Sequence, residues 1–322
     1  MPKVKIICGN NLDILQGMES GSIHCCVTSP PYWGLRDYGV DGQLGLEPTS
    51  EEYTAKTVEI FREVKRVLRD DGTLWLNLGD SYANTNRGHN SNGKGSLTGA
   101  NLKNKKIFQP NRYTPIPLGL KPKDLVGIPW RVAFALQADG WWLWQDIIWH
   151  KPNPMPESVR DRCTKAHEYI FLLSKSEKYF YDYDAIREIA VMAPGKSGFG
   201  GPKNNTGIKA HTNDLGKAWD KTKTRNKRSV WTVSTRPYRE AHFATFPPNL
   251  IKPCILAGCP VGGTVLDPFA GSGTTGKVSL ELARNAVLIE LNPEYISLIE
   301  GRINITPGLP LPGRYEAPEI GG

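Results

Sequence analysis

The 322-residue sequence has few cysteines and no long apolar run. Its six cysteines show no spacing typical of a zinc site, and no segment approaches the ~18 apolar residues of a membrane span. The N-terminus lacks an apolar segment followed by a small-residue cleavage site. These absences predict reduced thiols, no bound metal, no membrane contact and a cytoplasmic location.

Acidic residues are scarce in two segments. Residues 84–123 contain eight Lys or Arg and no Asp or Glu, and residues 196–239 contain eleven Lys or Arg against two Asp. Since the whole chain carries +8 and these segments carry +8 and +9, the remainder carries −9. Basic segments on an acidic body bind phosphates. The pattern favours a nucleic-acid partner over two merely solvated loops.

The apolar residues alternate between strand-like and helix-like patterns. Thr49 and Glu52 form a capping box before a helix that we expect to end near Gly72, and Asn292 and Pro293 begin the last helix. Between the helices lie β-branched and apolar strands such as "KVKIICGN" and "SIHCCVTS". This alternation predicts a doubly wound α/β sheet with two insertions.

A glycine turn in "VLDPFAGSGTTGKV" follows one of these strands and has two interpretations. "GSGTTGK" fits a phosphate-cradling loop, but Val278 stands where that loop needs Ser or Thr to hold magnesium. Asp267 before the turn and Glu290 at the end of the next strand instead suit a cofactor with a cationic amino group and two ribose hydroxyls. The pair favours S-adenosylmethionine.

The stretch "SPPYW" leaves another apolar strand through two prolines. If the cofactor donates a methyl group to an exocyclic amine, Ser29 and the Pro30 carbonyl can accept hydrogen bonds from that amine, and Pro30 and Pro31 hold these acceptors rigid. Tyr32 can stack on a base swung out of a duplex. Trp33 either lines this pocket or packs in the core.

The strings "TSPPYW" and "DPFAGSGTT", in this order, resemble the two defining motifs of the β group of amino-methylating DNA methyltransferases. The likeness extends over nearly the whole chain. It implies a Rossmann-like, mixed methyltransferase sheet of seven strands in which the strands before Ser29 and Asp267 are neighbours. The cofactor-binding residues it implies are Asp267, Pro268, Phe269, Gly271, Ser272, Gly273, Thr274 and Glu290; Asn10 stands where the family usually has Asp.

The resemblance also divides the chain into functional parts. Residues 1–184, with a basic loop at 83–123, form the catalytic part, residues 185–240 the target-recognition region, and residues 241–305 the cofactor-binding part. Residues 306–322 form a Pro/Gly-rich tail. The expected partners are double-stranded DNA and, in a bacterial, archaeal or phage-infected cell, a restriction endonuclease; the sequence sets no oligomeric state. Lys151, Arg225, Lys227 and Arg228 are the candidate DNA contacts.

Several alternatives stay open at this point. Cytosine N4 is the favoured target, because family members with Ser first in the acceptor motif usually methylate it. Adenine N6 is the alternative, since both amines demand the same geometry. A C5-cytosine mechanism needs a thiolate, for which Cys254 is the candidate, although core packing suits it better. An RNA methyltransferase, an ATP-driven DNA-binding protein and a non-enzymatic DNA-binding module complete the set. His167 and Glu168 are expected to be structural.

Overall fold

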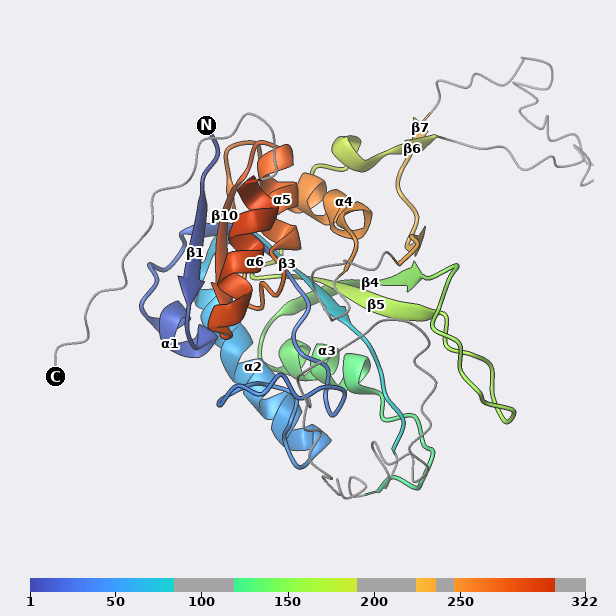
Figure 1. The fold of residues 1–322 in the computed structure, drawn as a ribbon. Helices are drawn as coiled ribbons and strands as arrows, with labels where there is room; N and C mark the ends of the chain where they lie inside the picture. The colour runs from blue at the N-terminus through green and yellow to red at the C-terminus, as the bar shows by residue number, and fades with distance from the viewer. Residues whose placement is uncertain (84–118, 190–223, 236–245, 305–322) are drawn as a thin grey trace, which may run out of the picture.

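The computed structural model describes residues 1–83, 119–189, 224–235 and 246–304 (Figure 1). Most of the basic loop 83–123, most of the region 185–240 and the tail 306–322 lie outside these ranges. One large sheet has the strand order β1-β10-β9-β2-β3-β5-β4-β8. Its strands are β1 (Val4–Cys8), β2 (Ile23–Thr28), β3 (Leu68–Leu78), β4 (Trp142–His150), β5 (His167–Ser174), β8 (Val230–Thr232), β9 (Thr264–Asp267) and β10 (Asn285–Glu290).

The sheet is mixed, as predicted, because β5 runs antiparallel to both β3 and β4 while the other pairings are parallel. The prediction of seven strands is one short. The extra strand, β8, comes from the 185–240 region and pairs with the end of β4. A three-residue segment carries too little periodic pattern to be recognised without its partner. In a separate two-stranded sheet, β6 (Glu188–Ile189) pairs antiparallel with β7 (Thr224–Arg225).

Helices cover both faces of the sheet (Figure 1). One face carries α1 (Asn11–Gln16), α2 (Ser50–Val67) and α3 (Ile128–Ala138), and the other carries α4 (Pro248–Gly258), α5 (Thr274–Glu281) and α6 (Pro293–Asn304), with a short 3-10 turn, η1 (Asp184–Ile186), beside α4. The first layer buries one apolar cluster against the strands, and the second layer buries two. Within the described ranges, no helix has the length and apolar character to cross a membrane.

The ends of α2 show where local pattern and tertiary packing disagree. Thr49 caps the helix as predicted, its Oγ1 accepting from the backbone N–H of Glu52 at 3.1 Å. The helix ends at Val67 rather than near Gly72. Leu68 is extended and fully buried, and it begins β3 by pairing with Ile23 of β2. The residues from Leu68 to Gly72, which were expected to finish the helix, therefore belong to the sheet instead.

The strands that end at Thr28 and Asp267 are neighbours, as the resemblance implied. Cys25 and Cys26 of β2 pair in parallel with Val265 and Leu266 of β9. From this boundary the chain leaves β9 through α5 and leaves β2 through α2, toward opposite edges of the sheet and on opposite faces. Such a switch point opens a crevice at the carboxyl ends of the strands, where α/β folds bind ligands.

Candidate active site

Asp267 joins the two strand ends at this crevice. Its carboxylate accepts hydrogen bonds from Thr28 Oγ1 at 2.7 Å, Thr275 Oγ1 at 2.6 Å and the Phe269 backbone N–H at 3.1 Å. The residue is only 1% exposed, and burial raises the pKa of its carboxyl to about 6. The structure thus gives Asp267 three internal donors, and the side chain holds β2, β9 and α5 in register rather than facing open space.

The glycine turn between β9 and α5 takes a backbone path suited to glycine. Gly271 and Gly273 have φ values of +53° and +75°, which L side chains rarely adopt. A Cβ on Gly273 would lie 2.8 Å from Ile299 Cγ2, so α6 also requires glycine there. A Cβ on Gly271 would meet no side chain within 4 Å. The first glycine therefore borders open space and the second allows close packing.

Two hydroxyls on the turn differ in their surroundings. Ser272 Oγ is fully buried and accepts from the guanidinium of Arg302 on α6, so this side chain turns away from the crevice. Its predicted contact with a cofactor does not fit that orientation. Thr274 is the first residue of α5, and its Oγ1 is buried without a hydrogen-bond partner among the described residues. A buried polar atom of this kind requires a partner to offset its desolvation.

Glu290 ends β10 on the other side of the turn. Its carboxylate accepts from the backbone N–H groups of Gly271 at 2.7 Å and Asn292 at 2.9 Å. Burial raises the pKa of Glu290, and those two N–H groups oppose the rise. The side chain is fixed by backbone donors while each oxygen keeps a further lone pair.

Pro268 and Phe269 continue the turn between these carboxylates. The Pro268 carbonyl accepts from Asn11 Nδ2 at 3.3 Å, and the partly buried Phe269 ring packs against the apolar cluster of the first helix layer. Asn10, the predicted substitute for an acidic contact, is the N-cap of α1: its Oδ1 accepts from the backbone N–H groups of Leu12 and Asp13. The observed role of Asn10 is therefore to begin a helix.

The acceptor motif leaves β2 as the prolines predicted, in a constrained turn. Pro30 is buried, and the Pro31 carbonyl accepts from the hydroxyl of Tyr53 on α2 at 3.0 Å. Trp33 is only 1% exposed and donates from Nε1 to the Glu47 carbonyl at 2.9 Å. Of the two roles considered for Trp33, packing is the one that this geometry supports, and the predicted base contact does not fit it.

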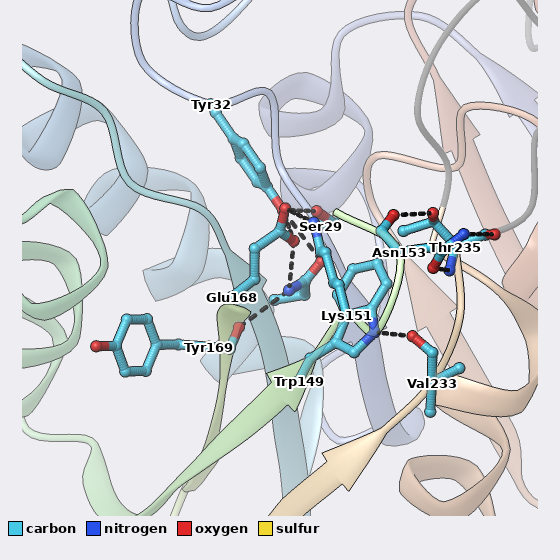
Figure 2. A network of polar contacts seen from close by, with 10 residues as sticks. Ser29, Tyr32, Trp149, Lys151, Asn153, Glu168, Tyr169, Val233 and Thr235 are labelled. Atoms are coloured by element: carbon cyan, nitrogen blue, oxygen red, sulfur yellow. Dashed lines mark hydrogen bonds and ion pairs between the residues drawn. The ribbon is translucent and has the colours of Figure 1, made fainter. Parts of the chain in front are cut away.

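Tyr32 lies in a polar network at the ends of four strands (Figure 2). Its hydroxyl accepts from Ser29 Oγ at 3.4 Å and lies 2.8 Å from Glu168 Oε2 and 3.1 Å from Asn77 Oδ1. The same Glu168 forms an ion pair with Lys151. Burial, followed by the nearby Glu168 charge, raises the pKa of Tyr32. The hydroxyl therefore stays protonated and donates to a carboxylate.

Two members of this network, Glu168 and Asn77, are not among the site residues predicted from the sequence. Glu168 heads β5 and was expected to be structural, and Asn77 lies within the apolar end of β3. Asn77 Nδ2 also donates to the Tyr169 carbonyl at 3.0 Å. The sequence signal that could have found Glu168 is a charged residue at the start of an otherwise apolar strand. This signal does not say which residues Glu168 contacts, because strand pairing decides them.

Lys151 follows β4, and its ammonium turns into the network (Figure 2). The side chains of Lys151 and Glu168 are 18% and 16% exposed. Lys151 Nζ also lies 4.2 Å from the ring centroid of Trp149. This largely buried position does not fit the phosphate contact expected for Lys151.

The other three basic residues predicted to contact DNA lie in or near the paired strands β6 and β7 and strand β8. Arg225 and Arg228 both donate to Glu188 Oε1 at 2.9 Å, and Lys227 Nζ lies 5.0 Å from the ring centroid of Trp231. Arg228 remains 68% exposed. Glu188 holds two arginines together, and their role toward DNA stays a prediction.

Cys254 and Lys277 bear on two of the alternatives left open, the C5-cytosine mechanism and the ATP-driven DNA-binding protein. Cys254 is buried in α4, where its Sγ contacts the Leu250 carbonyl, and burial raises the pKa of its thiol. A protonated, buried thiol is a poor nucleophile. Lys277 points along α5 to Glu281, 4.0 Å away, rather than over the glycine turn. Within the part of the chain that the structure describes, Cys254 is therefore not placed for C5 attack and Lys277 is not placed for triphosphate binding.

A family model for DNA methylases of the N6/N4 type matches residues 23–301. The chain belongs to this family. Over 295 residues it is 49% identical to the type II methyltransferase M.Cfr9I of Citrobacter freundii, covering 92% of this chain and 86% of that one. Over 300 residues it is 51% identical to the type II methyltransferase M.SmaI of Serratia marcescens, covering 93% and 90%. The predicted family is confirmed.

Solved structures show the same fold as the methyltransferase. The PvuII cytosine-N4-specific DNA methyltransferase aligns with a TM-score of 0.62 at 18% identity, over 94% of this chain and 86% of that one. The complex of M1.HpyAVI with S-adenosylmethionine aligns with a TM-score of 0.52 at 16% identity, over 94% and 100%. The Rossmann-like methyltransferase sheet predicted from the sequence is confirmed, and the family's methyl donor is S-adenosylmethionine.

The crevice of the methyltransferase fits this cofactor in three respects. Gly271 leaves space beside the turn, Thr274 Oγ1 offers a buried donor or acceptor that lacks a protein partner among the described residues, and Glu290 is fixed with lone pairs to spare. Glu290 at the end of β10, with Asp267 buried nearby at the end of β9, also provides the negative charge that a cationic cofactor requires.

Proposed function

We propose that the methyltransferase acts on the exocyclic N4 amine of a cytosine swung out of double-stranded DNA. The observation that carries the proposal is the orientation of the Ser29 hydroxyl. Ser29 donates to Tyr32, and Tyr32 in turn lies 2.8 Å from the Glu168 carboxylate, which can only accept. The Ser29 proton therefore points toward Tyr32 and the Tyr32 proton toward Glu168, so the lone pairs of Ser29 Oγ are left to accept from an amine.

An exocyclic amine needs such acceptors because its lone pair is delocalised into the ring. Ser29 Oγ and the Pro30 carbonyl would accept the two amine hydrogens and draw the nitrogen toward a tetrahedral shape. Buried Pro30 and the Pro31–Tyr53 hydrogen bond keep these acceptors in place before the base arrives. Orientation and preorganised hydrogen bonds supply the rate without a covalent enzyme intermediate.

The cofactor, when bound, supplies a methyl group made electrophilic by its sulfonium sulfur. Glu290 would hold the ribose hydroxyls, Thr274 Oγ1 would gain the partner it lacks, and Gly271 would admit the cofactor against the backbone. Asp267 would act at short range through charge while fixing Thr28 and Thr275. Together these residues would orient the methyl donor toward the Ser29–Tyr32 turn, which follows the adjacent strand β2.

Base extrusion costs a few kcal/mol, and stacking on Tyr32 would return about 1–3 kcal/mol of this. Duplex DNA is the proposed substrate because the chain has two basic segments in an otherwise acidic body. Arg225, Lys227 and Arg228, within the proposed target-recognition region 185–240, are the proposed DNA contacts. A restriction endonuclease that cuts the same DNA sequence is the proposed partner, since similar proteins are type II methyltransferases.

The choice of cytosine rests on Ser29 and on the family pattern, in which Ser at the first motif position accompanies N4 methylation. A neutral hydroxyl accepts from either a cytosine or an adenine amine, so product analysis decides between them. The similar PvuII enzyme is itself cytosine-N4-specific, which supports the choice.

The test is to incubate the protein with unmethylated duplex DNA and labelled S-adenosylmethionine, digest the DNA and identify the modified nucleoside by mass spectrometry. N4-methylcytosine is the expected product. N6-methyladenine would retain the fold and amine chemistry but refute the assignment of the base. 5-Methylcytosine would refute the mechanism and implicate Cys254, and methylation confined to RNA would refute the substrate.

A further inference from the structure

The Lys151–Glu168 ion pair occupies a position that neither stability nor DNA-backbone binding explains well. Both side chains are mostly buried, and a buried ion pair is often no more stabilising than an apolar pair of similar volume. A lysine that contacts DNA phosphates needs an exposed ammonium. This ammonium instead belongs to the network that contains the acceptor residues Ser29 and Tyr32 (Figure 2).

The ammonium is held in place from several directions. Lys151 donates its backbone N–H to the Ala166 carbonyl at 2.8 Å, which fixes the end of β4 beside the start of β5. The Trp149 ring, on which Nζ lies, is itself fixed by donation from Nε1 to the Val233 carbonyl at 2.8 Å. Among the described residues, Glu168 is the one hydrogen-bond acceptor of Nζ. An ammonium has three donors, so donors remain for a ligand.

The chemistry of amine-bearing bases supplies the matching acceptor. In cytosine the ring nitrogen N3 is bonded to the carbon that carries the N4 amine, and it accepts hydrogen bonds. Thymine has an N–H group at that position and would oppose a group that only donates. An acceptor such as Ser29 for the amine and a donor such as Lys151 for the ring nitrogen therefore match two neighbouring atoms of one base edge.

We propose that Lys151 is a specificity-determining residue that donates a hydrogen bond to N3 of the flipped cytosine, and that Glu168 positions it. The proposal rests on the proposed cytosine-N4 function. Glu168 serves both halves of the site: one oxygen orients the Tyr32 and Ser29 hydroxyls, and the other holds the Lys151 ammonium. The acceptor for the amine and the donor for N3 are thus fixed by the same carboxylate.

The test compares cytosine with 3-deazacytosine, which replaces N3 by C–H, at the methylated position of a duplex. The measured quantity is kcat/KM on the cytosine duplex divided by kcat/KM on the 3-deazacytosine duplex. The intrinsic reactivity of the analogue cancels when this ratio is compared between variants. Because a hydrogen bond to a charged group is lost, the ratio of the wild type should exceed that of Lys151→Met by about 10- to 100-fold.

Two further variants separate this role from general disruption. Lys151→Met combined with Glu168→Gln leaves no unpaired buried carboxylate, and it should show the same reduced ratio with S-adenosylmethionine affinity retained. The matched control is Lys165→Met, since Lys165 is 17% exposed and lies 3.7 Å from Asp80 outside the network. This control should keep the wild-type ratio even if its activity falls. Glu168→Gln alone should lower the ratio, because the ammonium loses its charged partner.

An equal ratio, within threefold, in the wild type and both Lys151 variants would overturn the assignment of Lys151. A reduced ratio in Lys165→Met would do the same, because the effect would then not be specific to the network. The proposed function is scored first, on the unmodified duplex: absence of N4-methylcytosine there refutes the base itself. That failure is distinct from an unchanged ratio in an enzyme that does form N4-methylcytosine.

Discussion

Gly79 gives a sharp test of whether Tyr32 holds the base. The residue follows β3 at the rim of the crevice, and the Tyr32 ring lies directly on its backbone. A Cβ built on Gly79 would lie 2.9 Å from Tyr32 Cδ2 and closer still to Cε2. Real Cβ atoms do not approach other atoms this closely, so Gly79→Ala forces the ring to move while leaving every other side chain unchanged.

The expected loss follows from what the ring would leave behind. The Tyr32 hydroxyl is 2.8 Å from Glu168 and 3.1 Å from Asn77, and a hydrogen bond to a charged group contributes about 1.5–3 kcal/mol. Displaced stacking on the base is worth about 1–3 kcal/mol. Losing part of each raises the barrier by roughly 1.4–2.8 kcal/mol, which lowers kcat/KM about 10- to 100-fold.

Methylation kinetics on the proposed duplex substrate would measure this loss, alongside the Kd for S-adenosylmethionine and the melting temperature. The cofactor Kd should stay within twofold of wild type, because the glycine turn lies on other strands. Gly301→Ala is the matched control: it lies in α6, and a Cβ there meets nothing within 4 Å. This control should be as active as wild type and slightly more stable, since Ala favours a helix over Gly.

The reasoning is refuted if Gly79→Ala methylates DNA within threefold of Gly301→Ala. That result would mean that DNA methylation does not require the Tyr32 ring to keep its observed position. A parallel loss of cofactor affinity would also contradict it, because the substitution would have disturbed the crevice as a whole.

Three further predictions concern the crevice. Burial raises the pKa of Asp267 from 3.8 to about 6, so the native state binds more protons and the wild type loses about 3 kcal/mol of stability as pH rises through this range. Asp267→Asn should shrink that loss in urea titrations at pH 4 and pH 7; an unchanged loss would contradict it. Glu290→Gln replaces one of the two oxygens that accept from Gly271 and Asn292, and the Kd for S-adenosylmethionine, measured by calorimetry, should rise about 10-fold. Cys254→Ser should remain active in the nucleoside assay, since the thiol is buried and protonated; an inactive but folded variant would restore the C5 mechanism.

The chain's local patterns predicted much of the cofactor side of the site. Asp267, the glycines of the turn and Glu290 lie within 24 residues, on a strand–turn–helix–strand unit whose geometry is nearly local. Strand ends and a glycine turn in that order bring two carboxylates to one crevice whatever the rest of the sheet does. The interior roles of Asp267 and Ser272 were not predicted, because one partner of Asp267, Thr28, and the partner of Ser272, Arg302, come from elements outside this unit.

The acceptor side depended far more on tertiary contacts. The sequence predicted a rigid turn at Ser29–Tyr32 and an aromatic surface, but it left two roles open for Trp33. Burial against α2 and a hydrogen bond to Glu47 decide for packing. Likewise, Lys151 was expected to contact phosphate. The sequence around it, with Trp149 and two prolines, reveals its charge but not the direction in which its side chain points. Antiparallel pairing of β4 with β5, which sets Trp149 opposite Glu168, turns it inward.

By itself, then, the sequence determined the family, the α/β class, the methyl donor and the neighbouring positions of the two motif-bearing strands. The α/β class follows from strand–helix periodicity, and the methyl donor follows from the carboxylates on either side of the glycine turn. The family and the neighbouring positions of the two strands follow from the resemblance that the motifs carry. Only the tertiary structure decided that Glu168 joins Tyr32, Asn77 and Lys151, that β8 completes the sheet, and that α2 yields to β3 at Leu68. Each of these depends on which strands pair. A contact such as the Tyr32–Glu168 hydrogen bond, between residues 136 positions apart, is set by burial of the whole sheet rather than by any local pattern.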